Sequence, residues 1–247
     1  MPKFDGNDEL QQHNLTGHYG FSAAKIDTLG ASEYTLVSIL VDESGSTSSF
    51  IKEMEKCIEE IINSCKYSPR CDNLLLRICA FDNRFRELNG FKPLENVNAG
   101  DYIGSLRPGG STALFDSSFN IIEATNVYGK SLIGNDFSVN GIIFVITDGC
   151  DNASTFTAND IKNELVNSLK QENLESLVSI LIGVNVSDSN VSAALNDFHK
   201  VAGFTQYVQL EKADSKTLAK LAEFVSKSIS SQSQSLNSGG ASAPLTF

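Results

Sequence analysis

The sequence is poor in the residue types that build soft-metal sites. It contains only three histidines, which are widely spread, and its five cysteines form an odd set without a C-x-x-C pair. No zinc site is therefore indicated. Because 41% of the 247 residues are hydrophobic, a large core is expected, and the thiols are interpreted as reduced cysteines in a cytosol rather than as a disulfide framework.

Positive charge and membrane-spanning segments are also scarce. Lys and Arg number 19 against 30 Asp and Glu, and the resulting formal net charge of −11 argues against nucleic acid or an anionic membrane as the main partner. No apolar run is long enough to cross a bilayer, and the polar N-terminus lacks the apolar core of a signal peptide. We therefore expect a cytoplasmic protein with no nucleic-acid and no membrane partner.

The motifs of several enzyme classes are missing. No G-x-G-x-x-G follows a strand and no G-x-x-x-x-G-K-[ST] occurs, which argues against nucleotide binding. The G-x-S-x-G turn of serine hydrolases is absent as well. Cys150 lies near Asp148 in the sequence, but no motif ties a histidine to it, so it is interpreted as an incidental thiol.

The stretch 34–47 organises the rest of the chain. Residues 36–41 form a nearly continuous aliphatic run, typical of a strand covered on both faces in a parallel sheet. The run ends in Asp42-Glu-Ser44-Gly-Ser46, which places an acid and two hydroxyls at the carboxyl end of a strand, where open sheets bind ligands. Such hard oxygen donors suit Mg²⁺. A simple strand-to-helix turn remains an alternative, because Asp, Ser and Gly are common turn residues.

Strands and helices alternate along the rest of the chain. The alternation predicts an α/β fold, with a doubly wound, mostly parallel sheet, one antiparallel edge strand and helices on both faces. Strands are expected near 74–81, 84–91 (the antiparallel return strand), 141–147, 177–184 and 205–210. Helices are expected near 50–65, from 113, from a capping box at 157–160, at 191–198 and at 214–229, with a loop at 128–140.

These elements place one domain at residues 34–230. Residues 1–33 have weak periodicity and are interpreted as an N-terminal extension that lies over the domain or is partly disordered, with Tyr19, Phe21 and Ile26 as possible anchors. Residues 231–247 are rich in Ser, Gln and Gly, so a flexible tail is expected. A docking peptide at 244–247 is the less favoured alternative.

Three loops of this fold can converge on one cation. Asp42, Ser44 and Ser46 follow the first strand, and Asp148 follows the strand that begins near residue 141, so neighbouring strands would bring these side chains to one crevice. Thr112 comes from a turn with two glycines, which let the backbone approach closely. Five oxygen-bearing side chains could then surround a small ion.

These motifs resemble those of the von Willebrand factor A-type (VWA) domain family. The resemblance covers about residues 34–230 and rests on Asp42-x-Ser44-x-Ser46, Thr112 after Gly-Gly, and Thr147-Asp148-Gly149. It implies a Rossmann-like fold and an intact metal-ion-dependent adhesion site (MIDAS). In such a site the three hydroxyls bind Mg²⁺ (or Mn²⁺) directly, and the two aspartates act mostly through bound water.

The resemblance carries two further expectations. Glu43 stands where many relatives have a smaller residue, so a second carboxylate could point outward near the metal. The last helix, 214–229, corresponds to the element that shifts on ligand binding in adhesion-type relatives.

We therefore expect a Mg²⁺-dependent protein-binding module within an intracellular multiprotein assembly, and not an enzyme. Neutral hydroxyls leave the ion under-neutralised, so a Glu or Asp of a partner protein can fill an open coordination position. The residues specify neither the partner nor an oligomeric state. One alternative is a phosphatase-like hydrolase using Asp42, although Ser44 stands where that chemistry needs a second acid. The other is a structural subunit whose metal site only stabilises the fold.

Overall fold

Five parallel strands form the centre of an eight-stranded sheet in the computed structural model, which describes residues 10–16, 19–238 and 245–247. The central strand β3 lies between β4 and β6, and the sheet continues from β6 through β7 to β8. The bounds of these strands are β3 Glu33–Asp42, β4 Leu74–Phe81, β6 Ser138–Thr147, β7 Ser176–Gly183 and β8 Gln206–Gln209.

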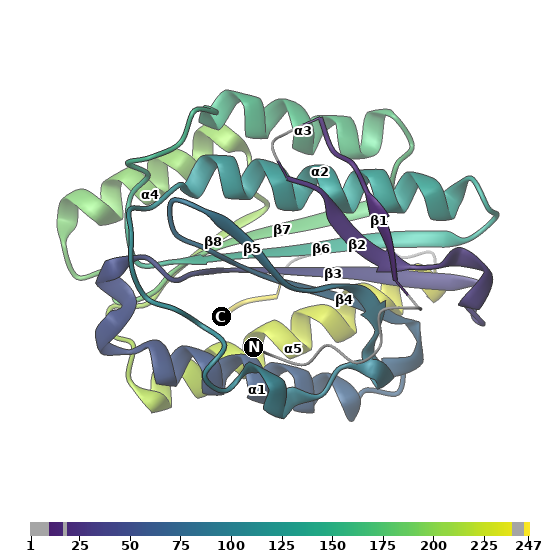
Figure 1. Ribbon diagram of the computed structural model, residues 1–247, viewed down its shortest axis with the longest axis horizontal. Coiled ribbons are helices and arrows are strands. Elements are labelled where there is room, and N and C mark those ends of the chain that lie inside the picture. Colours follow the sequence, from purple (N-terminus) through teal and green to yellow (C-terminus); the bar gives the residue numbers. More distant parts are fainter. Residues whose placement is uncertain (1–9, 17–18, 239–244) are drawn as a thin grey trace.

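Helices cover both faces of the sheet, because successive side chains of a strand point to opposite faces and both sets are apolar. Helices α1 and α5 cover one face, and α2, α3 and α4 cover the other (Figure 1). Val37, Ile39 and Val41 belong to the core cluster on the α1 and α5 side, whereas Leu40 belongs to the cluster on the opposite side. This confirms the predicted doubly wound α/β fold. The helices are α1 Ile51–Lys66, α2 Leu114–Ile133, α3 Ala158–Lys170, α4 Ser189–Ala202 and α5 Ser215–Ser238.

The predicted antiparallel return strand is β5 (Phe85–Pro93), which pairs with β4. Two further strands from the N-terminal extension lie beyond it: β2 (Phe21–Ala24) pairs with β5, and β1 (Leu10–His13) pairs with β2. The described part of the extension therefore widens the sheet, and β5 is not its outermost strand. Short 3₁₀ turns lie at Ile26–Thr28, Gly45–Ser49, Cys71–Asn73, Leu94–Asn96 and Ala99–Tyr102.

A fully buried arginine fixes the N-terminal strands to the domain. The Arg77 guanidinium carbon lies 5.7 Å from the ring centroid of Phe21 and 5.8 Å from that of Phe91. Arg77 also donates to Glu87 at 2.8 Å, and Glu87 in turn accepts a bond from the Ser22 backbone N–H at 3.0 Å. Cation–π contacts and a paired charge thus secure a strand too short to be stable alone.

The loop predicted at 128–140 is confirmed only at residues 134–137, because α2 extends to Ile133 and β6 begins at Ser138. Helix α2 continues to Ile133 because its apolar face continues through Tyr128 and Leu132, both fully buried. Gly129 sits in this turn of the helix because a Cβ there would lie 2.6 Å from the backbone oxygen of Asn173. The helix therefore packs too closely against the loop before β7 for a side chain to fit.

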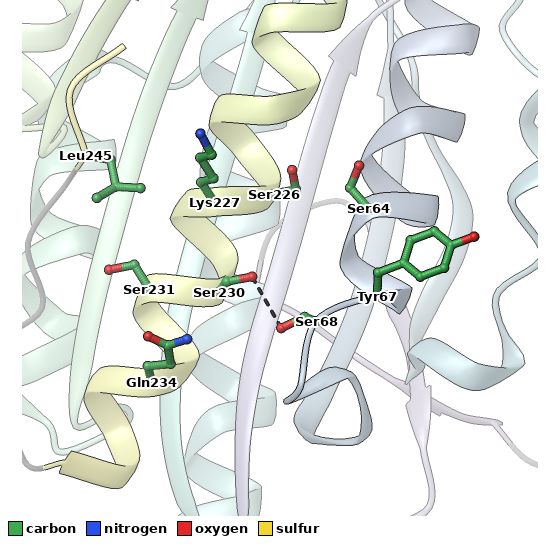
Figure 2. Close-up of a pocket in the computed structure, with 9 residues that line it drawn as sticks. All are labelled: Ser64, Tyr67, Ser68, Ser226, Lys227, Ser230, Ser231, Gln234 and Leu245. Carbon is green, nitrogen blue, oxygen red and sulfur yellow. Dashed lines mark hydrogen bonds between the residues drawn. The ribbon is translucent and has the colours of Figure 1, made fainter.

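The flexible tail predicted from residue 231 is also wrong as far as Ser238, because α5 continues to that residue. Its serines fold their hydroxyls back onto the helix: Ser226 Oγ donates to the Ala222 carbonyl and Ser228 Oγ to that of Phe224, both at 2.8 Å. Small side chains let α5 lie close to the end of α1. There the Ser230 hydroxyl donates a hydrogen bond to Ser68 Oγ at 3.3 Å, beside a pocket lined by several serines (Figure 2).

The last three residues pack onto the domain. Leu245 contacts the core layer beneath α1 and α5, and the Phe247 ring meets the Phe224 ring edge-on at 5.4 Å. Gln206 of β8 also donates to the Leu245 carbonyl at 3.0 Å. The end of the docking peptide considered at 244–247 is therefore bound to its own domain, whereas Pro244 lies outside the described residues.

Candidate metal centre

Asp42 is held at the end of the central strand by both carboxylate oxygens. Its Oδ1 accepts the Ser44 backbone N–H at 2.8 Å, and its Oδ2 accepts the Thr147 hydroxyl at 2.6 Å. Thr147 is the last residue of β6, the neighbour of β3. The parallel pairing of these two strands therefore brings the carboxylate to the end of β6, and leaves Asp42 only 1% exposed.

Two hydroxyls link this carboxylate to the second predicted loop. Ser44 Oγ lies 3.2 Å from Ser46 Oγ, and Ser46 Oγ donates to Asp148 Oδ1 at 2.8 Å. Asp148 directly follows β6. Four of the five predicted site residues, Asp42, Ser44, Ser46 and Asp148, thus form one chain of hydrogen bonds.

The fifth residue, Thr112, belongs to a loop tied to this chain through its backbone. The Gly110 carbonyl accepts the Gly45 N–H at 3.3 Å, and the Thr112 N–H donates to Asn152 Oδ1 at 2.8 Å. Gly110 has a φ of +70°, and a Cβ there would lie 2.9 Å from Asp82 Oδ2. Glycine is therefore required where the Thr112 loop passes between its neighbours.

The electrostatics of the cluster favour a cation. Burial raises the pKa of Asp42 to about 6, with a smaller contribution from the nearby Asp148 charge, and hydrogen bonds from Ser44 and Thr147 oppose the rise. Burial also raises the pKa of Asp148. Among the residues that the structure describes, no Lys, Arg or His forms an ion pair with either carboxylate.

The donor set fits a small hard dication. The hydrogen-bonded chain brings together two carboxylates and the Ser44 and Ser46 hydroxyls, and the predicted set adds the Thr112 hydroxyl. Oxygen donors of this kind are those that Mg²⁺ and Mn²⁺ prefer. Within the described ranges no group of three or more His, Cys, Asp or Glu side chains is placed to hold a metal. A metal at this edge of the sheet would therefore depend on the serine and threonine hydroxyls.

Glu43 does not point outward near this cluster, contrary to the expectation from the sequence. It is 2% exposed and forms a bidentate pair with Arg86, whose Nε and Nη2 lie 2.8 and 2.6 Å from its two oxygens. It also accepts the Arg107 N–H at 2.7 Å. An acid next to Asp42 in sequence faces the other side of the strand, and here it finds a basic partner on β5.

The sequence analysis missed two residues that hold the start of α2, which directly follows the Thr112 loop. Asp151 Oδ1 accepts the Phe115 N–H at 3.2 Å, and Ser154 Oγ accepts the N–H groups of Phe115 and Asp116 at 3.0 Å. These bonds cap the start of α2, whose first N–H groups have no partner within the helix. The available signal was the cluster of turn residues from Asp151 to Ser154 after the β6 strand.

Comparison with known proteins finds similarity in the fold but not in the sequence. No protein-family model and no curated protein sequence matches the chain. Among solved structures, the PilB minor pilin from Streptococcus sanguinis is similar with a TM-score of 0.56 at 14% identity, covering 85% of this chain and 64% of that one. Proximal thread matrix protein 1 from the mussel byssus has a TM-score of 0.52 at 17% identity, with 81% and 46% covered.

The fold is that of a von Willebrand factor A-type domain. A second structure of the mussel protein, at 16% identity and a TM-score of 0.52, has a zinc-occupied MIDAS motif. The pilus adhesin SpaC from Lactobacillus rhamnosus GG shares the fold at 10% identity and a TM-score of 0.54, and this chain spans 34% of it. At such identities the VWA likeness concerns the fold, and this chain matches only part of each of these proteins.

Two observations bear on the environment of this domain. Its five cysteines are all free, and Cys57, Cys65 and Cys79 are buried. Across the described ranges, no helix is both long enough and apolar enough to pass through a bilayer.

Proposed function

We propose that this VWA domain is a metal-dependent protein-binding module. Asp42, Ser44, Ser46, Thr112 and Asp148 would hold Mg²⁺ or Mn²⁺, and a Glu or Asp of a partner protein would bind there. The observation that carries the proposal is the hydrogen-bonded chain from Asp42 to Asp148, in which two carboxylates and two hydroxyls meet without a basic side chain.

The residues have distinct roles in this proposal. The Ser44 N–H and the Thr147 hydroxyl fix the orientation of Asp42, so its position does not depend on the metal. Ser44, Ser46 and Thr112 contribute neutral oxygens, which leave most of the charge of a dication uncompensated. A bound dication supplies an electrophilic coordination position that an acidic side chain can occupy. The strongest ligand for such a position is an anion from outside the chain.

Binding is a better account of Asp42 than nucleophilic catalysis. A phosphatase-like nucleophile needs an accessible oxygen, but Asp42 is 1% exposed and both of its oxygens accept hydrogen bonds. The position two residues on, where such an enzyme would need an acid, is Ser44. We therefore propose that the domain is not an enzyme.

We further propose that the module works within an intracellular assembly. Five free cysteines, none of them paired, suit a reducing compartment. The fold also occurs in a minor pilin and a pilus adhesin, so the setting needs its own test. An alkylating reagent added to denatured cell extracts without a reductant should modify all five thiols, whereas a disulfide would protect two of them and indicate an oxidising compartment.

Calorimetry tests the metal site, and affinity capture tests the partner. Titration with MgCl₂ or MnCl₂ should give one binding site in the unaltered protein and none in Asp42→Asn or Ser46→Ala. Proteins captured in Mg²⁺ should elute in EDTA and be lost with the same variants. Absence of metal uptake would refute the proposal. Metal uptake without any EDTA-eluted partner would instead support the alternative of a structural subunit.

A further inference from the structure

An apolar groove lies on the face of the sheet covered by α3 and α4, and it contains none of the five candidate metal ligands. It has a volume of about 410 Å³ and is lined by α3, by the start of β7 and by the turn after α4. Helix α3 contributes Leu165, Val166 and Leu169, and β7 contributes Leu177. Val166 is 40% exposed and Leu169 is 51% exposed, so the groove opens to solvent.

The groove exists because the neighbouring elements are short. Strand β8 begins at Gln206, which pairs with Ile180, so the first residues of β7 have a strand neighbour only on the β6 side. Helix α3 itself buries only Ile161 and Ser168, although its apolar residues recur at helical spacing. Its second apolar face, at Leu165, Val166 and Leu169, is therefore left partly uncovered.

A lysine stands at each end of this apolar face. Lys162 and Lys170 are eight residues apart on α3, which corresponds to about 12 Å along a helix. No acidic side chain lines the groove, and within the described residues neither lysine forms an ion pair. The chain has a formal net charge of −11, but the charged side chains that line this apolar groove are both positive.

We propose that this groove binds an acidic amphipathic helix of a partner protein. Such a helix would place its apolar side chains against Leu165, Val166 and Leu169, and acidic residues two turns apart against Lys162 and Lys170. This is the helix-in-groove mode of recognition, with charge complementarity setting the register. A small ligand fits less well, because pockets for small molecules enclose most of the ligand surface and Leu169 is half exposed.

The test is selection of a random amphipathic-helix library, displayed on yeast, against the full chain in EDTA. EDTA removes any contribution of the candidate metal centre, so this result is independent of the proposed function. Recovered helices should carry an apolar stripe flanked by Asp or Glu seven or eight residues apart. Their affinity should fall at least tenfold for Leu169→Ser and for the double variant Lys162→Glu with Lys170→Glu.

Matched controls come from other surfaces of the domain. Ile103 is 55% exposed outside the groove, so Ile103→Ser should leave binding unchanged. The double variant Lys52→Glu with Lys56→Glu, on the exposed side of α1, should also have no effect. Recovered helices without acidic flanks would overturn the proposal, as would a library that yields no helix sensitive to Leu169→Ser.

Two further outcomes assign the groove to a different occupant. Binding of oleate or phosphatidylserine vesicles that Leu169→Ser abolishes, without recovery of acidic helices, would identify a lipid. A dimer in light scattering that Leu169→Ser converts to a monomer would identify a second copy of this chain. Either result would overturn the proposal that the groove binds a helix of a partner protein.

Discussion

Ser46 Oγ donates a 2.8 Å hydrogen bond to Asp148 Oδ1, although 102 positions separate the two residues in the chain. The bond joins the loop after β3 to the loop after β6, and it exists because these strands are parallel neighbours. It also brings a hydroxyl from the first loop to a carboxylate of the second. The candidate metal centre therefore depends on β3 and β6 being parallel neighbours, because this arrangement brings the loops after both strands to the same edge of the sheet.

Replacing Asp42 with Asn should abolish metal binding while leaving the metal-free protein at least as stable. A tenfold change in proton affinity corresponds to about 1.4 kcal/mol, so raising the Asp42 pKa from 3.8 to about 6 indicates that the buried charge costs about 3 kcal/mol. Asn removes this charge and keeps an acceptor for the Ser44 N–H. We expect the affinity for Mg²⁺ to fall at least about 100-fold.

Thermal unfolding with and without MgCl₂ measures this difference. The unaltered protein should unfold at a higher temperature with the ion, and Asp42→Asn should show no response. Asp27→Asn is the control, because Asp27 is an exposed acid in a 3₁₀ turn. A metal-induced shift that survives in Asp42→Asn would contradict the assignment.

The stabilising effect of the metal should decrease as pH falls below about 6, the pKa of Asp42. The pKa of Asp42 is raised in the folded protein, so without metal the folded state takes up a proton first, and the contribution of this residue to stability increases as pH falls from 7 toward 4. Metal binding requires the ionised carboxylate, so protons compete with the ion below pH 6. Burial raises the pKa of Asp148 as well, which acts in the same direction.

With an Asp42 pKa of about 6, the apparent affinity for the metal should be about half its pH 8 value at pH 6 and about a tenth of it at pH 5, and the metal-induced shift in unfolding temperature should shrink accordingly. Asp42→Asn serves as the reference at each pH. A shift of equal size at pH 5 and pH 8 would show that metal binding does not require the ionised Asp42 carboxylate.

The central part of the fold could be predicted from the sequence, because its signals are local. The aliphatic run at 36–41 and the capping box at Thr157 and Asp160 both have the predicted structure. The proximity of Asp42 and Asp148 followed from the rule that carboxyl ends of parallel strands meet at one edge. These predictions needed no knowledge of side-chain partners far away in the chain.

The parts that were mispredicted depend on distant partners. Phe21 is confirmed as an anchor of the N-terminal extension, but strand β2 was not predicted, because its packing on Arg77 of β4 leaves no periodicity in residues 1–33. The position of Glu43 is set by Arg86, 43 residues later. Polar composition alone suggested that the chain after residue 230 is flexible, whereas residues 231–238 are helical and Gln232 forms hydrogen bonds with β6 and β7.

Gly110→Ala should destabilise the protein and weaken the metal centre. Its φ of +70° is unfavourable for a residue with a Cβ, and that Cβ would lie 2.9 Å from Asp82 Oδ2. We expect a loss of about 1–3 kcal/mol in the free energy of unfolding. Displacement of the loop would also break the bond from the Gly45 N–H, and the affinity for Mg²⁺ should fall with it.

Gly109→Ala is the matched control for urea unfolding and calorimetry. A Cβ at Gly109 would meet no atom within 4 Å, and its φ is not positive. Equal effects of the two substitutions would show that the geometry of Gly110 is not what holds Thr112 in place.

Gln232→Ala should lower stability although the residue lies in a segment with the composition of a disordered tail. Gln232 is 1% exposed, and its side-chain amide donates to the Gly141 carbonyl at 3.2 Å and to Ser176 Oγ at 2.9 Å. Its backbone carbonyl, which the substitution keeps, accepts a bond from Asn140 at 3.1 Å. Removing the amide leaves buried acceptors at the start of the central strands without this donor. We expect a cost of about 1–3 kcal/mol.

Gln234→Ala is the control for this substitution, because Gln234 is exposed two residues further along the same helix and has the same helix propensity. Urea unfolding should separate the two variants, with Gln234→Ala close to the unaltered protein. If residues 231–238 were flexible in solution, both substitutions would be silent. Truncation after Ser230 should cost at least as much as Gln232→Ala, because it removes the same buried amide together with the last turns of α5.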